Sequence, residues 1–321
     1  MKSINQKIDG QGERLSNLEV FSFGCGEIST NILFSITTVL LVFFYTDVVG
    51  VSAAAVGAII GISQIFNGAS DIVAGVLIDR TDTKQGRARP WLLRMAVPYG
   101  IAFVALMTVP AVGEFAQLIY IFITYNLLMT VVYTMLVIAF STLMTYITWD
   151  QKERSRLGVV RMAMSPIANI AVTLTFLKVV NAMGGNQAAW VKVTAIYALI
   201  AMLLILWCYF HTKERVEVKD QLEGEKLSVL TAVKVLFQNK YFWIITIYFI
   251  FTALYMTFNG TMLTYYCKYI LSNEELMGTI NMAGQIVMLI GVPLTGVLLS
   301  RFTKKNLCII GNVLIIAGSM M

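Results

Sequence analysis

Polar residues recur at helical spacing within the apolar stretch 52–78, and one of them is a carboxylate. Intervals of four, three, four, three and four place one set on a single helix face, namely Gly57, Gly61, Gln64, Gly68, Asp71 and Gly75. Asn67 lies one step round that face. A carboxylate in apolar surroundings is costly unless it faces protein groups or water, so it marks a functional site. We expect Asp71 to bind a cation or a proton; the alternative is a hydrogen-bonded carboxyl group that only ties helices together.

Three more apolar stretches carry polar faces of the same kind. Each set has helical spacing: Glu27, Asn31, Ser35 and Thr38; Asn126, Thr130, Tyr133, Thr134 and Ser141; and Arg161, Ser165, Asn169 and Thr173. Glu27 either serves a site or reaches water at a membrane interface. Arg161 is either an interface anchor or a two-pronged partner for a carboxylate or for sugar hydroxyls. Polar faces on four helices predict a hydrated central cavity.

The elements that must position these residues are membrane-spanning helices. The chain is 58% hydrophobic and 13% charged, against about 45–50% and about 25% in soluble domains. Eight stretches are free or almost free of charge and a ninth begins near 307: 28–45, 52–78, 96–112, 115–149, 162–177, 193–210, 241–267 and 276–300. Crossing a hydrocarbon core of about 30 Å takes about 20 residues. The sequence therefore predicts an all-α integral membrane protein.

The basic residues follow the topology of such a protein and do not indicate a nucleic-acid partner. Of 24 Lys and Arg residues, all but three lie in the N-terminal tail and in every second loop; the three are Lys178, Lys192 and Lys268. By the positive-inside rule, the N-terminus and these loops are cytoplasmic. The four cysteines and the single histidine have no metal-ligand spacing, so we expect neither a metal site nor disulfides.

A charged connector at 212–226 divides six predicted helices from the rest, and residues 227–240 have the pattern of an amphipathic surface helix. Residues 44–80 also match 265–301 without gaps, including the Gln-Ile pairs at 64 and 285 and the arginines at 80 and 301. Two parallel halves joined by a cytoplasmic linker are the plan of major facilitator transporters. We therefore expect an N-terminal half at 1–211, a linker at 212–240 and an incomplete second half at 241–321, with about eight to nine helices of an expected twelve.

Three motifs make a family resemblance specific. They are Tyr-Thr-Asp-Val-Val-Gly at 45–50, Gly-Val-Leu-Ile-Asp-Arg-Thr at 75–81 with Gly-Arg-Ala-Arg-Pro-Trp at 86–91, and Trp-Asp-Gln-Lys-Glu-Arg at 149–154. Together they resemble the glycoside–pentoside–hexuronide:cation symporters of the major facilitator superfamily, and the likeness covers nearly the whole chain. The resemblance implies a major facilitator fold and transport of a sugar or glycoside with a coupling cation, H⁺ or Na⁺, and no other cofactor.

The resemblance also implies site residues. The family's paired helix-2 acids match Asn67 and Asp71, and its helix-1 acid matches Asn31. With Gln64 and Thr134, these would form the cation region, while Tyr133, Arg161 and Glu27 would face the substrate. An acidic sugar-contact position of the family is Val137 here. Because a lone carboxylate can titrate by itself, whereas sodium needs several hard oxygens, we expect a proton rather than sodium.

We therefore expect a secondary active transporter working by alternating access, not an enzyme, and a monomer in the inner or plasma membrane with membrane lipid as its surroundings. The alternatives are a major facilitator carrier of a non-sugar solute, such as a lipid or drug, and a transport-incompetent fragment acting as a sensor or assembly partner. The fold does not fix the substrate, so the sugar rests on the family likeness.

Overall fold

The computed structural model describes residues 14–216, 235–272, 276–299 and 302–319, and every regular element within these ranges is a helix. Six helical segments of the described chain are long and apolar enough to cross a membrane: Asn17–Val48, Ala53–Asp79, Arg89–Met107, Glu114–Ile147, Gln151–Ala182 and Gln187–His211. Three shorter apolar helices are Lys240–Met256, Met282–Leu298 and Lys305–Gly318. These nine match the nine apolar stretches of the sequence, which confirms the all-α membrane fold.

Four of the long spans are single helices: α3 (Ala53–Asp79), α4 (Arg89–Met107), α7 (Gln151–Ala182) and α8 (Gln187–His211). The other two begin with α1 (Asn17–Ser35) and α5 (Glu114–Tyr125). The α1 span continues through π-helical turns at Ile36–Leu40 and Phe44–Val48, with α2 (Leu41–Phe43) between them. The α5 span continues through the π-helical segment η4 (Asn126–Tyr133) into α6 (Thr134–Ile147). Such π-helical turns occur often at functional sites.

Four of these helices begin where a polar side chain caps the first turn. Ser16 accepts from the Glu19 amide before α1, and Ser52 from the Ala55 amide before α3. Asp150 and Asn186 cap α7 and α8 in the same way. Because the first backbone N–H groups of a helix lack partners within the helix, these side chains fix where each span starts.

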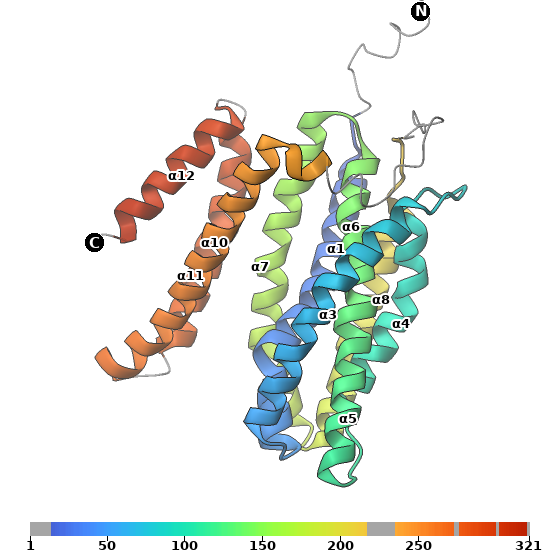
Figure 1. The fold of residues 1–321 in the computed structure, drawn as a ribbon, viewed down its shortest axis with the longest axis vertical. Helices are drawn as coiled ribbons and strands as arrows, with labels where there is room; N and C mark the ends of the chain where they lie inside the picture. The colour runs from blue at the N-terminus through green and yellow to red at the C-terminus, as the bar shows by residue number, and fades with distance from the viewer. Residues whose placement is uncertain (1–13, 217–234, 273–275, 300–301, 320–321) are drawn as a thin grey trace, which may run out of the picture. The chain divides into compact units, whose positions relative to one another are not determined.

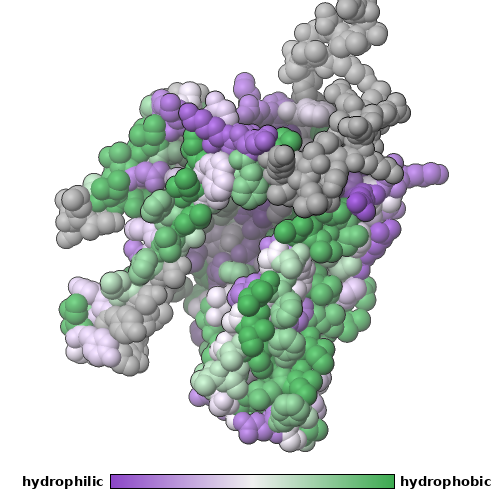
Figure 2. Space-filling view, in the orientation of Figure 1, coloured by the Kyte–Doolittle hydropathy of each residue, from purple (hydrophilic) through white to green (hydrophobic). Residues whose placement is uncertain are grey.

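The six spans of residues 14–216 pack into one bundle (Figure 1), in which α1 lies against α7 and α8, α4 against α8 and α6, and α3 against α6. Trp190 is fully buried in it, with ring centroids 5.1 Å from Phe44 and 5.4 Å from Phe176. Figure 2 shows hydrophobic side chains along the helices and hydrophilic ones at the end that carries the α3–α4 loop. This distribution is the one that a bilayer requires.

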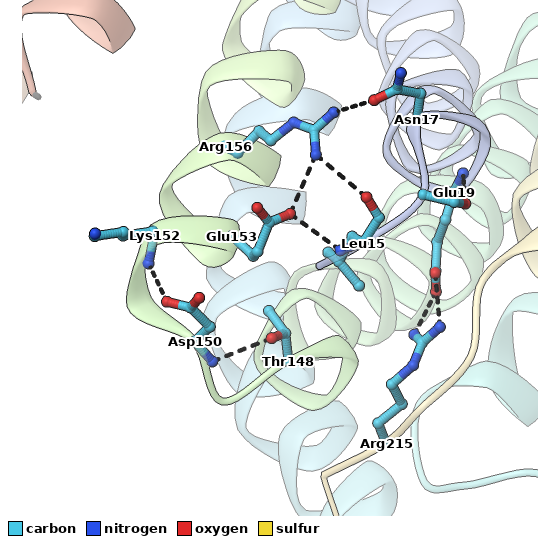
Figure 3. A network of polar contacts seen from close by, with 10 residues as sticks. Leu15, Asn17, Glu19, Thr148, Asp150, Lys152, Glu153, Arg156 and Arg215 are labelled. Atoms are coloured by element: carbon cyan, nitrogen blue, oxygen red, sulfur yellow. Dashed lines mark hydrogen bonds and ion pairs between the residues drawn. The ribbon is translucent and has the colours of Figure 1, made fainter. Parts of the chain in front are cut away.

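The residues after α8 are bound to the end of the bundle that carries the α3–α4 loop. Arg215 makes a two-pronged ion pair with Glu19 of α1, with Nη–Oε distances of 2.7 and 2.8 Å (Figure 3). The amides of Arg215 and Val216 both donate to the Tyr146 carbonyl near the end of α6. This segment therefore joins α1 to α6 at one end of the bundle.

Glu214 of the same segment caps α4. Its carboxylate accepts from the backbone N–H groups of Arg87, Ala88 and Arg89 at 2.8, 2.9 and 2.7 Å. Gly86 precedes them with φ +107°, and a Cβ there would lie 2.3 Å from the Glu214 carboxyl group. A carboxylate at a helix N-terminus is favoured by the unpaired amides and by the helix dipole. Because Gly86 has no Cβ, the Glu214 carboxylate can come close enough to accept from these amides.

The start of α7 holds the start of α1 (Figure 3). The Glu153 carboxylate accepts from the Leu15 amide at 3.3 Å, and Arg156 donates to the Leu15 carbonyl at 3.3 Å and to the Asn17 side chain. Arg156 also pairs with Glu153 at 3.2 Å. The N-terminal end of α1 is thus fastened from two sides, by α7 and by the segment after α8.

By their contacts the residues fall into two units, one of Met1–Val216 with Met288–Met321 and the other of Glu217–Val287. The second unit contains α10 (Lys240–Tyr265), η5 (Tyr266–Ile270) and the first part of α11 (Leu276–Leu298), while α12 (Lys304–Ser319) belongs to the first unit. Of the predicted amphipathic helix at 227–240, residues 227–234 lie outside the described chain and 235–238 are helical. The predicted division at 211 and 240 stays a prediction.

Candidate functional site

A ladder of polar side chains joins α1 to α7 inside the bundle. Glu27 and Arg161 form an ion pair with a 2.6 Å Oε2–Nε distance. Asn31 donates to the other Glu27 oxygen at 2.9 Å and accepts from the Ser165 hydroxyl at 2.8 Å. These two cross-helix contacts join residues 134 positions apart, as does a further contact from Ser35 to Asn169.

This constant separation follows from the geometry of the two helices. Both run in the same direction, and residues four apart lie one above the other on one face of a helix. The sequence predicts each face separately, from Glu27–Asn31–Ser35 and from Arg161–Ser165–Asn169. The structure adds that the two faces meet in register, so each polar group on α1 has its partner on α7.

The ion pair is largely shielded from solvent, since the Glu27 and Arg161 side chains are 12% and 24% exposed. Of the alternatives for Arg161, this arrangement resembles the partner of a carboxylate, although only one nitrogen makes the contact. That Glu27 and Arg161 serve a solute stays a prediction. The Arg161 contact uses Nε. Among the described residues no hydrogen bond to its two Nη atoms is formed, so these donors are available to a ligand.

One aromatic ring borders this pair and is held in place by its neighbours. Phe140 of α6 lies with its ring centre 5.3 Å from the Arg161 guanidinium carbon, a cation–π distance. Phe140 is itself stacked on Phe23 at 4.5 Å, and a Cβ on Gly26 would lie 2.5 Å from the Phe140 ring. Tyr133 of η4 is half-buried and packs against the core of the bundle. Gly26 therefore lets Phe140 approach α1 closely enough to support Arg161.

A second polar group joins α3 to η4. Thr130 donates to the Asn67 side-chain oxygen at 2.6 Å, and the Asn67 amide donates to Gln64 at 3.2 Å. Asn126 donates to Ser63 of α3 at 2.9 Å, and Ser70 to the Thr130 carbonyl. The π-helical turn of η4 thus presents Asn126 and Thr130 to the same helix.

The predicted cation residues are divided between these two groups. Asn67 and Gln64 lie together on α3, whereas Asn31 belongs to the α1–α7 ladder. The Thr134 hydroxyl donates to the Met129 carbonyl of its own span at 3.2 Å. Asp71 is exposed, and in the described part of the chain its carboxylate has no hydrogen bond or ion pair. Its role as cation ligand stays a prediction.

Sequence reasoning assigned no site role to several residues that the structure brings in. Ser165 and Asn169 had a signal, because their spacing from Arg161 placed them on its helix face. Phe140 and Gly26 had none, since a phenylalanine and a glycine in an apolar stretch are common in any membrane helix. Within the described residues no group of three His, Cys, Asp or Glu side chains could hold a metal ion, and all four cysteines are free thiols.

Comparison with known proteins identifies relatives over nearly the whole chain. Residues 22–321 match the family described as MFS/sugar transport protein. The chain is 29% identical over 308 residues to the isoprimeverose transporter of Lactiplantibacillus pentosus, covering 94% of this chain and 63% of that protein. It is 30% identical over 267 residues to the inner membrane symporter YicJ of Escherichia coli K12, covering 83% and 57%.

A third relative is the putative glycoside/cation symporter YagG of Escherichia coli K12, 28% identical over 293 residues, which cover 91% of this chain and 63% of that protein. The chain thus spans about six tenths of the length of these curated relatives. The proteins it matches are transporters and not enzymes. With its helical spans and its motifs, the chain belongs to the MFS/sugar transport protein family of multi-pass membrane proteins and is similar to the glycoside–pentoside–hexuronide:cation symporters.

Proposed function

We propose that the protein carries a sugar or glycoside across the cell membrane together with a cation, by alternating access. The observation that supports this most is the Glu27–Arg161 pair, a shielded carboxylate and guanidinium at 2.6 Å within a bundle of transporter helices. Relatives named as an isoprimeverose transporter and a putative glycoside/cation symporter favour a sugar as the solute. The proposal rests on relatives that are longer than this chain.

Sugar hydroxyls both donate and accept hydrogen bonds, and the α1–α7 ladder offers both functions. The Nη donors of Arg161 would bind sugar oxygens, while the Glu27 carboxylate would accept from hydroxyls. The hydroxyl of the half-buried Tyr133 on η4 would add a third contact. A sugar that enters this site would replace part of the hydrogen bonding between Glu27 and Arg161, while the two opposite charges stay close enough to compensate each other.

Asp71 would be the coupling carboxylate, with Asn67 and Gln64 beside it on α3. Glu27 is paired with Arg161, whereas among the described residues the Asp71 carboxylate has no hydrogen bond or ion pair. Sodium prefers several hard oxygen ligands, whereas a single carboxylate suffices to carry a proton. This favours proton coupling. Solute and cation would be coupled because each favours the conformation in which both sites are formed.

The distribution of basic residues supports one orientation of the protein in the membrane. The N-terminus and the loops around 80–89 and 152–156 would face the cytoplasm, because Lys and Arg are retained on that side. The membrane would be the plasma membrane, or the inner membrane of a cell with two. We propose a monomer, since each half of a major facilitator transporter packs against the other around one site.

Uptake by reconstituted vesicles tests the solute. Vesicles containing the protein should accumulate a radiolabelled glycoside or pentoside, and Arg161→Gln should abolish its binding because the Nη donors are lost. Arg156→Gln is the matched control, since that arginine lies at the start of α7 and binds Leu15 and Asn17. The proposal would be contradicted if the folded protein accumulated none of the glycosides tested. It would also be contradicted if Arg161→Gln and Arg156→Gln lost solute binding equally.

The coupling carboxylate has its own test. Asp71→Asn should stop concentrative uptake but leave exchange of labelled for unlabelled solute measurable, because the solute site keeps its Glu27–Arg161 pair. Asp82→Asn, an exposed carboxylate in the α3–α4 loop, should transport normally. Unchanged accumulation by Asp71→Asn would rule this residue out.

The choice of cation is tested by the gradients themselves. Uptake should persist when an imposed proton gradient is the sole driving force and should stop when an uncoupler collapses it. Accumulation driven by a sodium gradient in the presence of the uncoupler would show that sodium is the coupling ion.

A further inference from the structure

A groove runs between α1, α7 and α8 on the bundle formed by residues 14–216. It encloses about 390 Å³, and its lining is aliphatic except for Thr175 and Tyr197, whose hydroxyls hydrogen bond to each other. It is open at its side, because Ile196 and Ile200 are 48% and 42% exposed. It is distinct from the polar ladder, which uses another face of α1 and α7.

Two lysines border one end of this groove. Lys178 lies on α7 between the lining residues Thr175 and Val179, and Lys192 lies on α8 beside the lining residue Val193. Both lysines are exposed, and within the described chain neither forms an ion pair. They are also two of the three basic residues that lie outside the basic loops, so membrane topology does not account for them.

The two lysines lie beside the end of the groove that Val179 and Val193 line, and the two hydroxyls follow further along it. With a rise of about 1.5 Å per residue, Thr175 lies about 4.5 Å along α7 from Lys178, and Tyr197 about 7.5 Å along α8 from Lys192. Beyond them, away from the α7–α8 turn, the lining is made of aliphatic side chains such as Ile200, Leu204 and Ile28. The order of polarity is that of a phospholipid: phosphate, ester region and acyl chain.

We propose that this groove is a binding site for one anionic phospholipid. The headgroup phosphate lies between Lys178 and Lys192, the ester oxygens lie near the Thr175 and Tyr197 hydroxyls, and one acyl chain follows the aliphatic lining. Lysine side chains reach the headgroup level of a bilayer while their methylene stems stay in apolar surroundings, and basic pockets between membrane helices suit acidic headgroups. Two unpaired cations favour phosphatidylglycerol over the zwitterionic phosphatidylcholine.

Native mass spectrometry of the purified protein tests this site, with phosphatidylglycerol and phosphatidylcholine of identical acyl chains. The wild-type protein should retain phosphatidylglycerol several-fold more than phosphatidylcholine. The double variant Lys178→Gln/Lys192→Gln should lose that preference. Lys84→Gln/Lys152→Gln, which removes the same charge from exposed positions at the other end of the bundle, should keep it.

A second variant tests the acyl-chain part of the site. Ala171 is an exposed lining residue, so Ala171→Phe fills the groove without altering charge. Retention of both lipids by this variant should fall. Equal retention of the two lipids by the wild type would overturn the proposal, as would an unchanged preference in the lysine variant. A protein dimer that excludes lipid from the groove would also overturn it, by assigning this face to a second copy.

Discussion

Glu27 and Arg161 compensate each other's charge where little water reaches them. Replacing either by glutamine leaves the other charge without its partner, a loss of about 3–5 kcal/mol for a fully buried pair. With the two side chains 12% and 24% exposed, we expect about 2–3 kcal/mol for each single variant, reduced by that residual solvation. The double variant Glu27→Gln/Arg161→Gln should lose less than the sum, because no unpaired charge remains.

Unfolding of the purified variants in mixed detergent micelles measures these free energies. Glu153→Gln is the control, because it removes the charge of another ion pair at the start of α7. Its partner Arg156 keeps its contacts to Leu15 and Asn17, so the loss of unfolding free energy should be smaller. Strictly additive losses in the Glu27 and Arg161 variants would show that the two side chains do not act as a pair.

Gly26 is required for steric reasons. An added Cβ would lie 2.5 Å from the Phe140 ring and 3.1 Å from the Cys208 sulfur, so Gly26→Ala forces Phe140 away from Arg161. Overpacking of this kind costs about 1–3 kcal/mol, and we expect weaker solute binding as well. Gly57→Ala on α3, where a Cβ meets nothing within 4 Å, should be neutral or stabilising by up to about 1 kcal/mol. Equal stability of both variants in the same assay would contradict this role of Gly26.

At this scale the sequence predicts faces but not partners. The intervals of four residues identify Glu27, Asn31 and Arg161 as members of polar faces, because helix geometry alone decides that. The contact of Arg161 with Glu27 depends on how α1 and α7 pack, which no local pattern encodes. The predicted cation residues likewise have partners that the sequence does not predict. Asn67 contacts Thr130 of η4, whereas Asn31 lies in the α1–α7 ladder.

Among the elements, α4 begins where a side chain distant in sequence supplies its cap. Glu214 accepts three backbone N–H groups at the start of α4. Glu214→Gln keeps the side-chain size but removes the charge and one acceptor oxygen, so we expect a loss of about 1–2 kcal/mol. Hydrogen exchange of the amides at 87–89 should become faster.

Asp82→Asn is the matched control for this change, because Asp82 is an exposed carboxylate in the same loop. The exchange of the 87–89 amides should be unaffected in that variant. If both variants exchange alike, Glu214 is not the group that protects the start of α4.

The helices themselves could be predicted well because their signal is composition. Each of the nine apolar stretches coincides with a helix, and the polar caps at Ser16, Ser52, Asp150 and Asn186 mark starts that local sequence encodes. The π-helical turns at Ile36–Leu40 and Asn126–Tyr133 could not be predicted, since one extra residue in a turn leaves the apolar pattern almost unchanged. The cap by Glu214 is equally invisible, because 125 or more residues separate it from its amides.

For the whole molecule, the orientation in the membrane is the property that the charges predict. We expect residues 79–90 and 150–161 to face the cytoplasm, and residues 47–52 and 268–275 to face outward; of these, 273–275 lie outside the described chain. Single cysteines at Gln85 and Ser272, in a background with Cys308→Ser because Cys308 is the exposed native thiol, test this in intact cells with a membrane-impermeant maleimide. Labelling at 272 but not at 85 is expected, and the reverse pattern would invert the topology.

The α1–α7 ladder also has a consequence for how such sequences can change over time. Its cross-helix contacts keep one constant offset of 134 residues, from Glu27–Arg161 through Asn31–Ser165 to Ser35–Asn169. We call each of these cross-helix pairs a rung. If one residue of a rung is replaced by an apolar one, its partner is left as an unpaired polar group within the membrane unless it changes too. Positions i and i+134 should therefore vary jointly among homologues, whereas the neighbouring lipid-facing positions drift independently, and each rung should be exchanged as a unit during the divergence of new specificities.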